Sequence, residues 1–171
     1  MSERKNAVFR YIAYSIELIL AFVLLSTPNL IPELFGAKPA LLLCIALTAA
    51  VFEHEIPAMI FGAAAGILMD LGYADSIGLF AISLTIICFL LGWIANNLVT
   101  ANIWNFLLIA ALMIGGLYML YYLFNFVWAG IDDCELYFKN HILSRMIQTF
   151  LWSIVFYFLN RFIYHTLSEE A

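Results

Sequence analysis

Charged residues are scarce in this sequence. Only 11% of its 171 residues are charged and 65% are apolar, whereas a typical soluble domain has about 25% charged and 45 to 50% apolar residues. A chain of this length cannot hide so many apolar residues from water, because much of a small domain stays on its surface. The sequence therefore predicts an integral membrane protein. Its long apolar runs lack the two-residue alternation of barrel strands, so the spans should be helices.

Basic residues are fewer still. Seven Lys and Arg stand against twelve Asp and Glu, which gives a net charge of −5. The basic residues are also scattered along the chain. Proteins that bind nucleic acid concentrate positive charge on one face to neutralise phosphates. The composition therefore excludes a nucleic-acid-binding protein.

Cysteine is rare as well. Cys44, Cys88 and Cys134 are odd in number, and the first two lie in apolar runs, where a small hydrophobic residue is expected. They predict neither a disulfide framework nor a metal cluster. The run Glu53 to Glu55 offers three possible ligands, but consecutive helical residues cannot all face one ion. We expect no metal site.

Motifs of known catalytic sites are also missing. The acidic loop Asp132-Asp133-Cys134-Glu135 is similar to the magnesium-binding acids of membrane prenyl or phosphatidyl transferases, but a second acidic motif and a basic phosphate cradle are lacking. The chain has no GxSxG elbow and no phosphate-binding loop. We therefore expect no enzyme, no catalytic residues and no cofactor, with a lipid-processing enzyme as a weak rival.

Six apolar segments follow one another: Val8 to Ser26, Pro39 to Phe52, Ala58 to Met69, Ile77 to Ala95, Ile103 to Ala129 and Ile142 to Tyr164. Four have about the 20 residues that cross a bilayer, whereas the second and third are short. We predict an all-α polytopic bundle of about six transmembrane helices, and a single integral membrane domain over residues 1–171.

The two short segments need a structural explanation. Either they extend into flanking residues, or they form short helices that meet at a turn containing Glu53, with Pro57 in the first turn of the next helix. Pro39 opens the second segment. A broken helix exposed to lipid would leave backbone groups unpaired, so the second alternative requires this pair to lie inside the bundle.

The distribution of positive charge predicts the orientation. Arg4, Lys5 and Arg10 cluster at the first segment, whereas Lys38 and Lys139 lie in alternate loops. Positive residues favour the cytoplasmic side, and an even number of crossings returns the C-terminus to the side of the N-terminus. We expect both termini in the cytoplasm.

The third segment carries a stripe of small residues. Ala58, Gly62, Gly66 and Asp70 recur every four residues, so they share one face of a helix. In lipid, small residues let helix backbones approach closely. This face either packs inside the chain's own bundle or receives a partner protein.

Two acids lie within or near the spans. Asp70 is expected at one end of the third segment, where it either bonds to backbone N–H groups of the next segment or contacts a partner. Glu17 lies near the middle of the first segment. Buried ionisable groups at this depth are costly, so Glu17 is protonated, is paired with Arg10, or serves an ion or substrate.

An ordered set of short motifs resembles the rod shape-determining protein MreD family. The motifs are Lys38-Pro39-Ala-Leu-Leu-Leu, Phe52-Glu53-His-Glu, Phe61-Gly62-Ala-Ala-Ala-Gly66-Ile-Leu-Met-Asp70-Leu and Gly78-Leu-Phe-Ala81. The matched positions are Pro39, Glu53, Gly62, Gly66, Asp70 and Gly78. The resemblance also implies a fold similar to the six-helix substrate-binding subunits of energy-coupling-factor transporters.

The resemblance implies a non-enzymatic membrane scaffold of the bacterial elongation machinery. Family members bind the bitopic protein MreC and link actin-like MreB filaments to the lipid II polymerase and the penicillin-binding transpeptidase. The location would be the bacterial cell membrane, and self-association is possible. The alternative is the substrate-binding subunit of a vitamin-type transporter. Such a subunit needs polar residues inside the bundle, and the candidates are Glu17, Asn125, Gln148 and Asn160.

Overall fold

The computed structural model describes residues 2–27, 38–73, 78–97, 103–124 and 142–168. These residues form six helices and no strand: α1 (Ser2–Ser26), α2 (Leu41–Phe52), α3 (Glu55–Tyr73), α4 (Leu79–Asn97), α5 (Ile103–Tyr122) and α7 (Leu143–Ser168). All of them except α2 are long and apolar enough to cross a membrane. The predicted all-α fold is confirmed.

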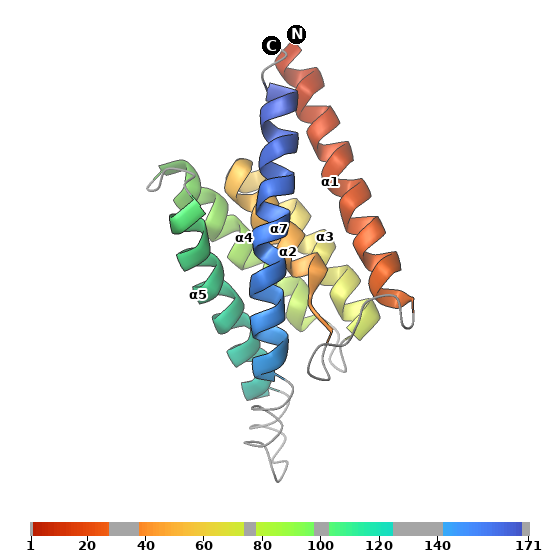
Figure 1. The fold of residues 1–171 in the computed structure, drawn as a ribbon, viewed down its shortest axis with the longest axis vertical. Coiled ribbons are helices and arrows are strands. Elements are labelled where there is room, and N and C mark those ends of the chain that lie inside the picture. The colour runs from red at the N-terminus through yellow and green to blue at the C-terminus, as the bar shows by residue number, and fades with distance from the viewer. Residues whose placement is uncertain (1, 28–37, 74–77, 98–102, 125–141, 169–171) are drawn as a thin grey trace.

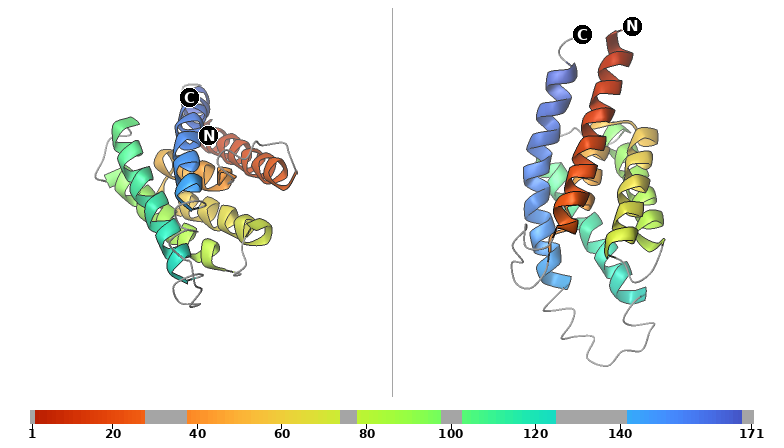
Figure 2. Two further views of the ribbon diagram at one scale, coloured as in Figure 1. Left: turned by 60° about the horizontal axis from the view of Figure 1, so that its bottom comes forward. Right: turned by 90° about the vertical axis from the view of Figure 1, so that its right-hand side faces the viewer.

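The helices pack around α2. Helix α2 contacts α1, α3, α4 and α7, and the views in Figures 1 and 2 agree that it lies in the middle of the bundle. Helix α5 stands at the edge, beside α7. The N- and C-terminal helix ends lie at the same end of the molecule, and the first residues of α2 lie toward the opposite end.

Helix α2 can be short because neighbouring helices shield it from lipid. Its 12 residues rise about 18 Å, less than the hydrocarbon thickness of a bilayer. Every residue from Leu41 to Val51 is at most 8% exposed. A helix that is apolar on all sides and surrounded by other helices does not meet lipid, so it need not reach either membrane surface. The prediction of a short second helix is confirmed.

Helix α3 follows the first of the two alternatives, extension into flanking residues, and so is not the short helix of the predicted bundle. It has 19 residues and extends beyond the predicted segment at both ends, from Glu55 to Tyr73. Pro57 lies in its first turn, where the missing N–H is tolerated. At the other end Asp70 has hydrogen-bond partners outside the helix, so its charge does not stop the helix.

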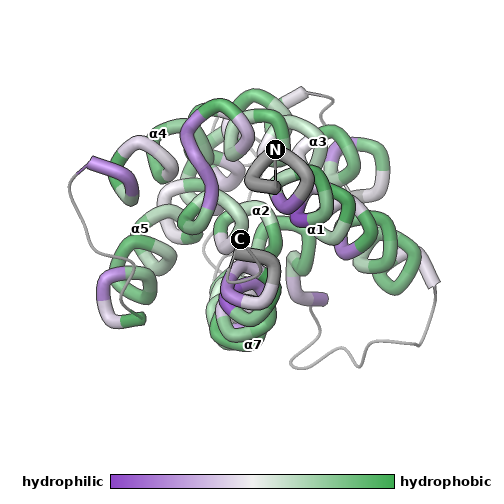
Figure 3. Tube along the Cα trace, turned by 90° about the horizontal axis from the view of Figure 1, so that it is seen from above, coloured by the Kyte–Doolittle hydropathy of each residue, from purple (hydrophilic) through white to green (hydrophobic). Residues whose placement is uncertain are grey.

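The outer surface of the bundle is apolar. Hydrophobic residues cover the helices along their length, and hydrophilic residues gather mainly near helix ends (Figure 3). Large side chains point away from the core on several helices, including Ile16, Ile86, Leu108, Leu112, Phe158 and Phe162. Such a surface is stable only against lipid or another protein in the membrane. The chain is a multi-pass membrane protein.

Candidate functional site

The small-residue face of α3 lies against α4. A Cβ atom added at Gly66 would come 2.5 Å from the Cα of Ala81 and 2.6 Å from the carbonyl oxygen of Phe80. One added at Gly62 would come 2.7 Å from both the Cβ of Cys88 and the carbonyl oxygen of Leu84. The two backbones therefore touch at positions where only glycine fits. Of the two alternatives given for this face, the structure therefore shows packing within the chain's own bundle.

Helix α4 contributes a matching small face. A Cβ atom added at Gly92 would come 2.9 Å from the Cα of Glu55 and 3.1 Å from the Cβ of Ala58. Gly92 was not among the predicted site residues. The signal was present in the sequence, because Ala81, Cys88 and Gly92 recur at helical spacing. The α3/α4 hairpin, defined here as Glu55–Tyr73 with Leu79–Asn97, is thus the closest helix pair in the described bundle.

Asp70 joins the two helices of the hairpin at their connected ends. Its Oδ1 accepts a hydrogen bond from the N–H of Phe80 at 3.1 Å, and its Oδ2 accepts one from the N–H of Ala81 at 2.9 Å. These N–H groups belong to the first turn of α4 and have no partner within that helix. The carboxylate satisfies them and complements the positive end of the helix.

Gly78 differs from the other glycines. It was one of the positions matched by the family resemblance, and it is not part of the packing face, because a Cβ atom added there would meet nothing within 4 Å among the described residues. Its φ angle is +100°, a conformation that side-chain-bearing residues rarely adopt. Gly78 therefore shapes the entry into α4, and its carbonyl accepts the hydrogen bond from the N–H of Ile82.

The α2–α3 turn is fixed by a buried ion pair. Arg10 Nε lies 2.7 Å from Glu53 Oε1 and Arg10 Nη2 lies 3.3 Å from Glu53 Oε2. The Glu53 side chain is only 2% exposed, and Arg10 also lies 4.9 Å above the ring of Tyr164. Within the predicted turn Glu53 is buried and paired with Arg10 of α1, which in turn contacts α7. His54, by contrast, is exposed.

Glu17 does not pair with Arg10. That alternative was wrong, because two nitrogens of the Arg10 guanidinium donate to the carboxylate of Glu53. This forked geometry is the one in which a guanidinium binds a carboxylate most strongly. Glu17 lies beside Asn160 of α7, and its two carboxylate oxygens make no hydrogen bond in the described part of the chain. The amide nitrogen of Asn160 donates to Thr48 Oγ1 at 2.6 Å. Three helices thus meet at a small polar cluster.

A groove runs between α1 and α3 on the surface of the bundle. Its volume is about 440 Å³. Its walls are mostly apolar and come from both helices: Tyr11, Ser15, Leu18, Ile19, Pro57, Ile60, Phe61, Ala64 and Leu68. Ser15 and Ala64 are small, and the side chains of Ile19 and Ile60 at its edges are exposed. This α1/α3 groove can receive an apolar segment in the membrane.

Comparison with known families decides the identity. The sequence matches the family of the rod shape-determining protein MreD over residues 5–162, a range that includes most of α1, all of α2 to α5 and most of α7. The chain belongs to the MreD family. No curated protein and no solved structure matches it. The likeness to energy-coupling-factor subunits stays a prediction.

Membership of the MreD family gives the chain a role in determining rod shape. MreD is a family of shape-determining membrane proteins and is not known as an enzyme family. Among the residues that the structure describes, no three potential metal ligands come together. The acids Asp132, Asp133 and Glu135, with Asn125, lie outside the described residues.

Proposed function

We propose that this chain is a non-enzymatic scaffold of the bacterial cell-elongation machinery and that it binds an MreC-like bitopic protein within the cell membrane. Both termini would be cytoplasmic. The family match supports the role in cell shape. The α1/α3 groove is the observation that carries the proposed binding, because it is an open, apolar surface at the depth of the spans.

The groove suits a single helix of a partner. The stripe on α3 is not available to a partner, because α4 already covers Gly62 and Gly66. Close helix approach in lipid needs small residues, and Ser15 and Ala64 supply them on facing walls of the groove. A partner helix there would contact α1 and α3 at once.

The mechanism would be positional. Packing between helices in the membrane would hold MreC at a fixed place and angle, and no bond would be made or broken. Through MreC, the scaffold would place actin-like MreB filaments near the lipid II polymerase and the penicillin-binding transpeptidase. The proposed result is organised peptidoglycan synthesis along the cell wall.

Filling the groove tests this function. Ala64→Leu places a larger side chain on the groove wall, and Ala111→Leu makes the same change on the exposed face of α5. We expect Ala64→Leu to reduce copurification with MreC from detergent-solubilised membranes and to round the cells, while Ala111→Leu does neither. Equal recovery of MreC with both variants, at equal membrane abundance, would remove the groove from the binding surface.

A further inference from the structure

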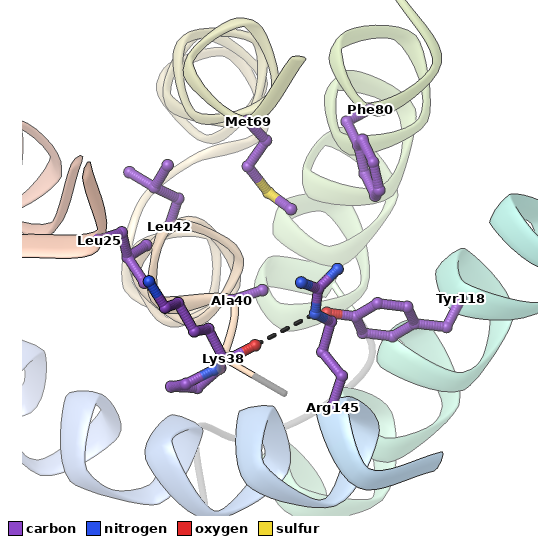
Figure 4. A pocket seen from close by; sticks show the side chains of 9 residues that line it. Leu25, Lys38, Ala40, Leu42, Met69, Phe80, Tyr118 and Arg145 are labelled. Carbon is purple, nitrogen blue, oxygen red and sulfur yellow. Dashed lines mark hydrogen bonds between the residues drawn. The ribbon is translucent and has the colours of Figure 1, made fainter. Parts of the chain in front are cut away.

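A small pocket, drawn in Figure 4, lies beside the start of α2, toward the end of the bundle opposite the termini. All six described helices or their immediate flanks contribute to it, among them Leu25, Lys38, Leu42, Met69, Tyr118 and Arg145. Its volume is about 20 Å³. That is room for one water-sized group. The pocket combines apolar walls with two cationic residues, which neither the hairpin nor the α1/α3 groove does.

Arg145 is held in a fixed orientation in this pocket. Its Nε–H donates to the carbonyl oxygen of Lys38 at 3.1 Å, and its two terminal nitrogens point into the pocket (Figure 4). A guanidinium presents its donors in a planar fork that matches an oxyanion. Lys38 lines the same pocket, but its side chain extends toward Leu25, away from the guanidinium of Arg145 (Figure 4).

The start of α2 adds backbone donors. Ala40, the residue before the helix, provides no side-chain cap, and the first turn contains no acid. The Ala40 N–H donates to Thr149 Oγ1, but the N–H groups of the first helical residues have no partner within the helix. Ala40 and Leu42 both line the pocket. The positive end of the α2 dipole therefore faces it.

The buried hydroxyl of Tyr118 is a second observation that indicates a bound group in this pocket. The Tyr118 side chain is 1% exposed and lines the pocket. Thr149 of α7 lies close to its hydroxyl, but no hydrogen bond of regular geometry joins that hydroxyl to the described residues. In Figure 4 the hydroxyl points toward the guanidinium of Arg145. A buried hydroxyl without a partner is costly. Asp70, next to the pocket residue Met69, accepts from Phe80 and Ala81 and makes no hydrogen bond with the Tyr118 hydroxyl.

We propose that this pocket binds a phosphate oxyanion. Donors from three elements, Arg145, Tyr118 and the start of α2, converge from different directions, which suits a tetrahedral group better than a planar carboxylate. The volume admits only an edge of the phosphate, so the rest of the molecule stays outside, near the apolar Leu25 and Met69. The phosphate comes from a lipid headgroup or from a soluble phosphate compound. Both sources present the same oxygens to the pocket.

The test measures phosphate binding by the purified full-length chain. Ligands are phosphatidylglycerol, phosphatidylcholine and inorganic phosphate, and the readouts are lipid adducts in native mass spectrometry and thermal stability. Tyr118→Phe removes only the unpartnered hydroxyl, so it should leave the unliganded protein equally or more stable. We expect it to weaken binding of the preferred phosphate ligand about tenfold, as loss of one hydrogen bond to a charged group predicts.

The control variant changes Arg161, which lies toward the other end of α7 from Arg145. Arg145→Gln should reduce binding more than Tyr118→Phe, while Arg161→Gln, which changes an exposed arginine, should leave it unchanged. Preference for phosphatidylglycerol over phosphatidylcholine assigns a lipid source, and a comparable effect of inorganic phosphate assigns a soluble one. Binding that is the same in wild type, Tyr118→Phe and Arg145→Gln overturns the proposal. If Arg145→Gln does not fold, Tyr118→Phe decides alone.

Discussion

At the scale of single residues, the space around each glycine separates structural glycines from replaceable ones. Gly66 touches the backbone of α4, whereas among the described residues no atom of another helix lies within 4 Å of the position that a Cβ would take at Gly116 of α5. Backbone cannot move aside as a flexible side chain can. The same added methyl group should therefore have opposite effects at these two sites.

Gly66→Ala should destabilise the protein, because the α3 and α4 backbones would have to separate. Overpacking of this kind costs about 1 to 3 kcal/mol or more. Gly116→Ala should be neutral or stabilising, since alanine favours a helix over glycine by about 0.5 to 1 kcal/mol. Thermal unfolding of the two purified variants in one detergent measures the difference. Equal midpoints would show that the α3/α4 contact is looser than described.

The Arg10–Glu53 pair allows a second prediction. Glu53→Gln leaves a largely buried guanidinium without its carboxylate, and loss of one partner of a buried pair costs about 3 to 5 kcal/mol. Combining it with Arg10→Gln should restore part of that loss, since no unpaired charge remains. Unfolding free energies of the two single variants and the double variant give the coupling. Additive losses would mean that the two charges act independently.

At the scale of elements, Asp70 determines how α4 begins. Asp70→Ala should free the N–H groups of Phe80 and Ala81, at a cost of about 1 to 3 kcal/mol. Their hydrogen exchange should speed up, while amides in the middle of α4 keep their protection. Asp70→Asn retains one acceptor and should give an intermediate result. If exchange at Phe80 and Ala81 does not change in Asp70→Ala, water or another group replaces the carboxylate.

Sequence patterns located the helices well but not the relations between them. Apolar runs placed both ends of α4 and α7 within a few residues, because burial in lipid depends on composition. For α1 they gave the end at Ser26 but not the start, which lies at Ser2 and not at Val8. The length of α3 was left open between two alternatives, because the sequence does not show that Asp70 has hydrogen-bond partners on α4 that let the helix continue past it. The spacing of Gly62 and Gly66 predicted a close contact but could not say with which helix.

The pairing of charges was even less predictable. Glu53 lies 43 positions from Arg10, and their contact depends on how the α2–α3 turn meets α1. Local spacing gave a pair with Arg10 as one of the alternatives for Glu17, whereas the three-dimensional packing brings Glu53 to Arg10 instead. The cationic pocket was hidden for the same reason, because Lys38, Tyr118 and Arg145 come from distant segments.

At the scale of the whole molecule, the two proposed binding places are lined by different residues. Residues of α1 and α3 line the groove, whereas the start of α2 contributes to the pocket and not to the groove. Partner binding and phosphate binding would therefore occupy separate places. A change in either one should leave the other intact.

The orientation of the bundle can be tested with single cysteines. The termini lie at one end and Thr27, after α1, lies toward the other. Cys44 and Cys88 are buried, so a Cys134→Ser background leaves them as unreactive internal controls. With cytoplasmic termini, Thr27→Cys should react with a membrane-impermeant maleimide in spheroplasts, because the first crossing brings it to the outer side. Thr166→Cys, exposed near the end of α7, should react only after the membrane is opened. The reverse pattern would place the phosphate pocket at the cytoplasmic side and exclude the proposed topology.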